Sequence, residues 1–175
     1  EPDLFGSILN QAVPLGLAGV KLTGGEPLFH PAFTRLLDTI RAKDLGLSLE
    51  TNAVLCTQDL AKRLFDFPRR FVSVSLDSPH APTHDWIRGT VGSFRLAVRG
   101  IEHLVSAGVR PQIIMTVMRR NRDHLADLVA LAERLGAESV KFNILQPTAR
   151  AETLYRQGEA LPLADLISLG RWVET

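Results

Sequence analysis

A short segment near the N-terminus, Gly24-Gly25-Glu26-Pro27, joins two adjacent glycines to a carboxylate and a proline. Two glycines let a ligand approach the backbone without interference from Cβ atoms. Pro27 disfavours a helical backbone at Glu26, so we expect the carboxylate to project from the end of a strand formed by residues 19–23. A carboxylate beside open backbone groups suits a ligand that carries an ammonium group. An ordinary strand-to-helix turn would fit the same four residues.

Polar side chains recur at the ends of the predicted strands. Active sites in parallel α/β folds gather at the carboxyl ends of the strands, so these residues predict one small-molecule site on that edge of the sheet. Simpler roles also fit: Asn52 suits a left-handed turn, the Ser75 hydroxyl suits a backbone hydrogen bond, and Asp77 suits a loop cap. Together with Glu26, the residues at strand ends are Thr51, Asn52, Ser75, Asp77 and Leu145.

The elements that would carry these residues alternate between strand and helix along the chain. Short apolar runs predict strands, and apolar residues at helical spacing predict helices. This alternation favours βα units and a parallel sheet, which is the α/β class. The predicted strands are residues 19–23, 47–51, 71–76, 111–118 and 139–145, and the predicted helices are residues 4–18, 33–40, 57–65, 93–105, 121–135 and 163–173.

The segments between these elements are predicted to be irregular. Residues 78–92 read as a long connection, and residues 146–162 as a polar linker. The continuous apolar strand at 111–118 predicts burial on both faces of the sheet. Periodicity alone does not distinguish an open doubly wound sheet from a barrel. The predicted N-caps of the helices are Thr57 or Asp59, Ser93, and Asn121 or Asp123.

The composition limits the classes of function. The chain has 175 residues, enough for one domain with a buried core, and its formal net charge is +1 with acidic and basic residues interspersed. No basic face indicates nucleic acid, and no apolar run is long enough to span a membrane. The first residues do not resemble a signal peptide, so we expect a cytoplasmic protein. They also lack an initiator Met, which favours a fragment of a longer chain.

The single cysteine, Cys56, gives the strongest exclusion. It cannot form a disulfide within the chain, which fits a reducing compartment. One thiolate also cannot hold an iron–sulfur cluster, which needs several cysteine ligands. We therefore expect Cys56 to be a small buried apolar residue. We predict no metal ligands in this chain, because the following histidines lack metal-ligand spacing on one element: His80, His84, His103 and His124.

Five segments, in order, resemble motifs of radical S-adenosylmethionine (SAM) enzymes. They are the Gly24–Pro27 segment, Thr51–Ala53, Val72–Asp77, His84–Gly89 and Asn143–Ala151. The last resembles the branch that carries an auxiliary-cluster (SPASM or twitch) extension. The resemblance implies a partial (β/α) TIM-like barrel of about five parallel strands with outer helices. Residues 1–175 would form one partial radical SAM core, strands two to six of the family, without strand one and its CxxxCxxC loop.

The resemblance also assigns roles to the polar residues. Glu26 matches the residue that binds the SAM ammonium, and Ser75 and Arg88 match residues that engage the SAM carboxylate. One extra residue between Ser75 and Arg88 relative to close relatives shifts the expected position of Arg88. Asn143 and Leu145 lie where the family brackets adenine. The full set of cofactor-binding residues implied is Gly24, Gly25, Glu26, Pro27, Thr51, Asn52, Ser75, Asp77, Arg88, Asn143 and Leu145.

Thr51 and Asn52 would meet the ribose or the sulfonium side, or only form a turn. Asp77 would face ribose or substrate, or cap the following loop. For Arg88 an exposed loop position fits as well as a carboxylate contact, and for Leu145 a plain core position fits as well as an adenine contact. The Leu145 contact with adenine would be through the backbone.

The function implied is that of a radical SAM enzyme. In the family, an electron from a 4Fe–4S cluster reductively cleaves SAM to a 5′-deoxyadenosyl radical, which abstracts hydrogen from a peptide, protein or small-molecule substrate. Flavodoxin or ferredoxin would supply the electron to the full-length parent. The cluster ligands are absent from this chain, so we expect the isolated chain to be inactive.

A second class of function also fits the sequence. A non-catalytic α/β domain could bind a small amino-containing ligand or a protein partner, and its longer parent would have no CxxxCxxC motif upstream. A TIM-barrel lyase or aldolase would need a catalytic lysine at a strand end. This class is disfavoured because Lys21 and Lys141 lie inside predicted strands. With strand one missing, residues 20–23 would form an open edge, so we expect dimerisation, domain swapping or cover by the N-terminal helix. The substrate depends on loops and on any following domain.

Overall fold

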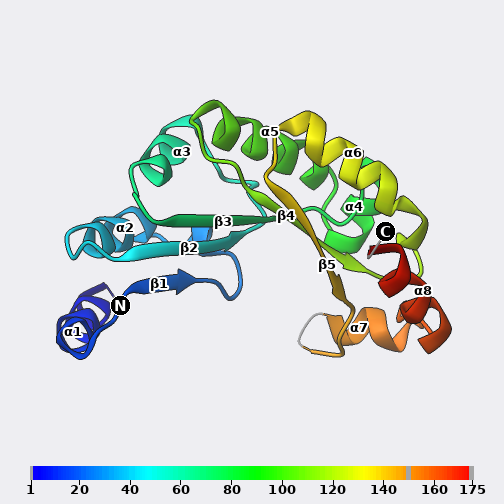
Figure 1. The fold of residues 1–175 in the computed structure, drawn as a ribbon, viewed down its shortest axis with the longest axis horizontal. Helices are drawn as coiled ribbons and strands as arrows, with labels where there is room; N and C mark the ends of the chain where they lie inside the picture. The colour runs from blue at the N-terminus through cyan, green and yellow to red at the C-terminus, as the bar shows by residue number, and fades with distance from the viewer. Residues whose placement is uncertain (1, 149–150, 174–175) are drawn as a thin grey trace.

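The computed structural model describes residues 2–148 and 151–173, and its centre is a five-stranded parallel sheet (Figure 1). The strand order follows the chain, from β1 at one edge to β5 at the other. The α/β class and the parallel sheet predicted from the alternation are confirmed. Dimerisation through the β1 edge stays a prediction. The strands are β1 (Gly19–Leu22), β2 (Gly46–Thr51), β3 (Arg70–Ser75), β4 (Gln112–Val117) and β5 (Ser139–Ile144).

The sheet curves into an arch, and helices α2, α3, α5 and α6 cover its convex side (Figure 1). Helix α4 packs against α5 near the strand ends. Helix α1 lies at the β1 end of the arch, and α7 and α8 lie at the β5 end. None of the described helices is long and apolar enough to cross a membrane. The helices are α1 (Pro2–Ala12), α2 (Phe33–Arg41), α3 (Gln58–Phe65), α4 (Ala81–Arg88), α5 (Ser93–Ser106), α6 (Leu125–Leu135), α7 (Ala151–Arg156) and α8 (Leu163–Val173), with short 3-10 turns η1 (Val13–Leu15), η2 (Pro27–Phe29) and η3 (Arg122–His124).

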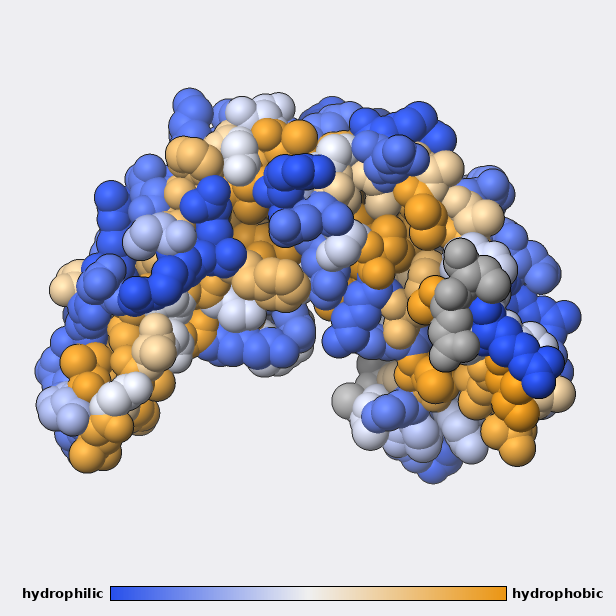
Figure 2. Space-filling model, viewed as in Figure 1, coloured by the Kyte–Doolittle hydropathy of each residue, from blue (hydrophilic) through white to orange (hydrophobic). Residues whose placement is uncertain are grey.

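The two faces of the sheet differ in chemistry. In β2 and β4 every second residue is fully buried, as Leu47, Leu49 and Met115 are, and these side chains form the core with the outer helices. The expected burial of both faces of the 111–118 strand is therefore wrong, because the inner face of the arch has no layer of helices over it. Figure 2 shows that the arch is hollowed on one side.

The concave face carries polar side chains. The Lys21 ammonium lies 2.6 Å from the Glu50 carboxylate, and the Thr23 hydroxyl donates to the same group at 2.9 Å. The Lys21 hydrogen bond is the main cause that lowers the pKa of Glu50. On β4 and β5, the side-chain amide of Gln112 donates to the Ser139 hydroxyl at 3.1 Å. The interior of a closed TIM barrel is instead packed with branched apolar residues, so this face is suited to polar contents.

Two helices occupy segments that were predicted to be irregular. Helix α4 lies inside 78–92, where Pro82 falls in the first turn and needs no amide partner, and Gly89 ends the helix at φ 69°. Helix α7 lies inside 146–162 and has too few residues for a clear apolar period. The prediction of an irregular 78–92 segment was wrong because its prolines and glycines, which are typical of loops, here begin and end a helix.

The helix caps differ partly from expectation. The Thr57 hydroxyl accepts from the Leu60 amide at 3.2 Å, which confirms one predicted N-cap. Helix α5 instead begins after Gly92, and neither Asn121 nor Asp123 makes a side-chain cap. For α5 the acceptor comes from Asp85, whose carboxylate accepts from the Gly92 and Phe94 amides at 2.6 and 2.8 Å. Asp85 lies seven positions before the cap, outside the range of local capping rules.

Candidate functional site

The Glu26 carboxylate lies where β1 ends, and the surrounding chain fixes its orientation. Its Oε1 accepts from the Thr51 hydroxyl at 2.6 Å and from the Leu28 amide at 3.1 Å. Its Oε2 accepts from the Asn52 amide at 2.6 Å. A carboxylate oxygen has about two acceptor positions, so Oε1 is saturated and Oε2 retains capacity for one more donor. A rigid carboxylate with one open acceptor position can bind a cationic N–H donor.

The turn after β2 is built to present its amide to Glu26. Asn52 Oδ1 accepts from the Val54 amide at 2.9 Å, and Thr51 Oγ1 accepts from the Ala53 amide at 3.0 Å. The left-handed residue of this turn is Ala53, with φ 58°, rather than Asn52. The Thr51 side chain is buried and faces Glu26, so both turn residues act through the carboxylate in this structure.

The glycines before Glu26 leave open space. Gly24 has φ 118°, a conformation that disfavours any side chain. A Cβ built on Gly24 or Gly25 would meet no atom within 4 Å. The backbone beside the Glu26 carboxylate is therefore accessible to a ligand.

A second polar group lies where β3 ends. Asp77 is 1% exposed, and its Oδ2 lies 2.7 Å from Arg88 Nε on α4. Its Oδ1 accepts from the Thr116 amide of β4 at 3.0 Å. The Asp77 carboxylate thus joins β4 and α4, and the exposed fraction of the Arg88 side chain is 22%.

Asn121 closes the same group from the next loop and is fully buried. Its Nδ2 donates to the Asp77 carbonyl at 2.8 Å and to the Thr116 carbonyl at 2.9 Å. Its Oδ1 accepts from the Met118 amide at 2.8 Å. The sequence predicts only a helix cap for Asn121, because its actual role depends on contacts across as many as 44 residues.

His84 lies behind Asp77 and is 2% exposed. Its Nδ1 accepts from the Asp77 amide at 3.1 Å, so the ring is neutral in this arrangement. Burial lowers the pKa of His84 to about 4 from 6.5; the Asp77 carboxylate opposes this shift and the Arg88 charge adds to it. His84 is therefore a structural residue, and its protonation at Nδ1 would break the hydrogen bond from the Asp77 amide.

We expect the free energy of unfolding to fall by about 2 kcal/mol between pH 7 and pH 5 because of His84. The pKa is lower in the folded state, so the unfolded chain binds the proton first as the pH falls below 6.5. The loss is complete only below about pH 4. Urea unfolding at each pH would measure it. His84→Asn, which keeps an acceptor near the Nδ1 position but does not titrate, should have a flatter profile; an equally steep profile would contradict the assignment.

The remaining predicted residues lie along the ends of β3 and β5. Ser75 is the last residue of β3 and is partly buried. Asn143 of β5 lies in register with Thr116. Leu145 is 5% exposed, and its amide donates to the Val117 carbonyl at 3.3 Å. All the predicted strand-end residues therefore share the carboxyl edge of the sheet, in three groups.

A family model described as the radical SAM superfamily matches residues 2–132. The chain belongs to this superfamily. The Ala149 and Arg150 positions of its Asn143–Ala151 segment lie outside the described residues.

Among the curated relatives of this radical SAM chain, "AdoMet-dependent heme synthase" of Nitratidesulfovibrio vulgaris is 36% identical over 135 residues, 77% of this chain and 37% of that protein. "Mycofactocin maturase MftC" of Mycobacterium tuberculosis is 36% identical over 147 residues, 83% of this chain and 37% of that protein. The chain thus spans little more than a third of the length of these relatives.

Solved structures share the fold. Streptococcus suis SuiB, in a crystal structure with bound S-adenosylmethionine, has a TM-score of 0.81 at 17% identity, covering 99% of this chain and 40% of that chain. Native anSMEcpe with bound AdoMet has a TM-score of 0.74 at 17% identity, covering 94% of this chain and 48% of that chain. The partial (β/α) barrel expected from the sequence is confirmed.

The two cofactors of the radical SAM family fit this chain differently. The accessible Glu26 carboxylate and the open backbone at Gly24 and Gly25 fit the ammonium end of SAM. The chain does not fit a 4Fe–4S cluster: its one cysteine, Cys56, is 5% exposed. Burial, and to a lesser degree the Glu26 charge, raises the pKa of the Cys56 thiol to about 12. Cys56 is thus the buried apolar residue that was predicted.

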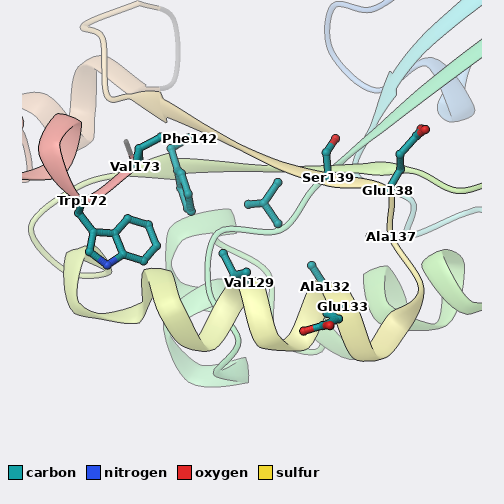
Figure 3. Close-up of a pocket in the computed structure, with 10 residues that line it drawn as sticks. Val129, Ala132, Glu133, Ala137, Glu138, Ser139, Phe142, Trp172 and Val173 are labelled. Atoms are coloured by element: carbon teal, nitrogen blue, oxygen red, sulfur yellow. The ribbon is translucent and has the colours of Figure 1, made fainter. Parts of the chain in front are cut away.

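A separate groove lies on the outer side of β5, away from the strand ends (Figure 3). The groove measures about 590 Å³ and is lined by α6, β5 and α8, with Phe142 and Trp172 at one end and Glu133 and Glu138 at the other. The Phe142 and Trp172 rings meet edge-on at 5.8 Å. No group of three metal-ligating side chains occurs in the described residues, here or at the strand ends.

Proposed function

We propose that this chain forms most of the SAM pocket of a radical SAM enzyme in the branch with an auxiliary-cluster extension. The observation that carries the proposal is the Glu26 carboxylate, which three internal donors hold at the strand edge with one acceptor position on Oε2 left. The SAM ammonium would donate to that position. Such a charge-assisted hydrogen bond contributes about 1.5–3 kcal/mol.

The carboxylate and adenine ends of SAM would meet the residues at the ends of β3 and β5. Ser75 and Arg88 would bind the SAM carboxylate, with Asp77 orienting Arg88 through its Nε. Asn143 and the Leu145 backbone would bracket adenine. Thr51 and Asn52 would act by orienting Glu26, since both donate to it. The protein's part is to place and shield SAM, which supplies the radical chemistry of the family when bound.

The substrate proposed is a peptide, a protein side chain or a small molecule from which the full-length enzyme abstracts hydrogen. Peptide substrates are supported by two related structures, SuiB bound to the precursor peptide SuiA and anSMEcpe bound to a peptide. The polar concave face, with Lys21 and Glu50, would suit a polar substrate segment. The full-length enzyme would need a 4Fe–4S cluster and an electron donor such as flavodoxin or ferredoxin.

SAM titration followed by ligand-observed NMR tests the proposal. Without a cluster we expect weak binding, with a dissociation constant on the order of 1 mM. Glu26→Gln should lower the affinity for SAM about tenfold or more, because it removes the negative charge that pairs with the ammonium group. Since the new amide faces donors that Glu26 accepts from, we also expect a stability loss of about 1 kcal/mol.

Thr51→Val is the matched control for that loss. It removes one hydrogen bond to Glu26 and keeps the charge, so it should change the SAM affinity by no more than about threefold. If both variants bind SAM as the wild type does, Glu26 is only part of a turn and the chain is better described as a non-catalytic domain.

A further inference from the structure

Residues 151–161, the strap, cross the ends of β4 and β5 and close a small apolar cluster apart from the main core. Helix α7 forms the first half of the strap, beside the end of β5 (Figure 1). The cluster lies between the strap, α4 and the ends of the two strands. Its members are Ile87, Met118 and Leu145, with Ala151, Leu154 and Ala160 from the strap.

A carboxylate holds the strap in place. Glu159 is 9% exposed; its Oε2 accepts from the Arg120 amide at 3.0 Å, and its Oε1 lies 3.2 Å from Arg120 Nε. Backbone contacts join the same two segments: the Arg119 amide donates to the Glu159 carbonyl at 2.8 Å, and Arg119 Nε donates to the Ala160 carbonyl at 3.1 Å. Burying a carboxylate is unfavourable unless it is paired, so the Arg120 contacts fix where the strap ends.

The same contact reaches helix α4. The Arg120 guanidinium lies 3.6 Å from the centre of the Trp86 ring, a cation–π distance. Trp86 precedes Arg88 by two residues on α4, and Ile87 between them packs in the apolar cluster. Glu159 therefore orders Arg120, and Arg120 links the strap to the helix that carries Arg88.

We propose that Glu159 is a positioning residue for the adenosyl end of SAM. It latches the strap against Leu145 and α4, so that the wall beside the adenine contact is fixed before the ligand arrives. This inference rests on the proposed function, in which Leu145 borders adenine. It adds a residue outside every motif that resembles the family.

5′-Methylthioadenosine has the adenosyl end of SAM but no ammonium or carboxylate. Its binding therefore tests the role of Glu159 independently of the role of Glu26. We expect Glu159→Gln to weaken it about three- to tenfold in a ligand-observed NMR titration, and Glu159→Ala to weaken it more, because only Gln still accepts from the Arg120 amide. Glu152→Gln is the control: Glu152 lies on the same strap and pairs with Arg156 at the surface, so its affinity should match the wild type.

Glu26→Gln should weaken SAM and leave 5′-methylthioadenosine unchanged. If Glu26→Gln leaves the SAM affinity unchanged while the Glu159 variants weaken 5′-methylthioadenosine binding, the proposed ammonium site is wrong and the positioning role of Glu159 is supported. If the Glu159 variants bind 5′-methylthioadenosine as the wild type does, Glu159 only holds the strap and the inference is wrong. Absence of binding to the wild-type chain would overturn both.

A second variant covers the case in which the Glu159 variants do not fold. Arg120→Lys keeps a charge opposite Glu159 and removes the planar group over Trp86. In a Trp172→Phe background, Trp86 is the one tryptophan left in the chain, so its emission reports on that stack. We expect the emission to change and the 5′-methylthioadenosine affinity to fall; a changed emission with unchanged affinity would contradict the latch.

Discussion

Asp77→Asn is expected to lower the free energy of unfolding by about 3–5 kcal/mol, because it leaves the Arg88 guanidinium without its carboxylate. Asp77 is 1% exposed and its Oδ2 lies 2.7 Å from Arg88 Nε. Asparagine can still accept from the Thr116 amide, but its own NH2 group would then face the guanidinium. The variant thus isolates the charge pair from the backbone hydrogen bond.

Asp66→Asn is the matched control, since Asp66 pairs with Arg41 at 3.1 Å while both side chains are about half exposed. It should cost less than about 1 kcal/mol. Urea unfolding followed by circular dichroism at pH 7.5 would compare the two. Equal midpoints would mean that the Asp77–Arg88 pair is no more important than a surface pair, and that Asp77 is available for a ligand.

Gly100→Ala is expected to cost about 3 kcal/mol, despite the better helix propensity of alanine, because of a backbone collision. A Cβ on Gly100 would lie 2.2 Å from the Ala53 carbonyl oxygen and 2.9 Å from the Ala53 Cβ. Helix α5 would have to move away, or the Ala53 turn would have to shift. That turn presents the Asn52 amide to Glu26, so we also expect weaker SAM binding.

Gly170→Ala controls for helix propensity. Gly170 lies in α8, and a Cβ there meets no atom within 4 Å outside its own helix. This variant should gain about 0.5–1 kcal/mol. The same urea experiment applies. A gain for Gly100→Ala as well would show that α5 and the Ala53 turn are not in close contact.

The sequence was sufficient to predict the sheet and the position of Glu26. Alternating strands and helices determine a parallel sheet, and the carboxyl ends of parallel strands share one edge, so residues after β1, β2 and β3 must be neighbours. The Gly24 conformation and the direction of Glu26 follow from local rules for glycine and proline. These rules need only adjacent residues.

The polar network behind the site could not be predicted in this way. His84, Asp85 and Asn121 each bond to backbone groups that are distant in sequence or on another element. Their residue types fit ordinary helix caps and loops, and the pairing depends on how α4 packs against the strand ends. Helix α4 was not predicted either, so its contacts with the strand ends could not be predicted.

The most direct measurement of the central claim is the position at which SAM binds the chain. In ¹⁵N–¹H correlation spectra, we predict that SAM shifts the amides of Leu28 and Asn52, which donate to Glu26, together with that of Leu145. The Leu28 and Asn52 shifts should be strongly reduced in Glu26→Gln at the same SAM concentration. Shifts confined to the groove of Val129, Phe142 and Trp172, or none at concentrations several times about 1 mM, would contradict the account.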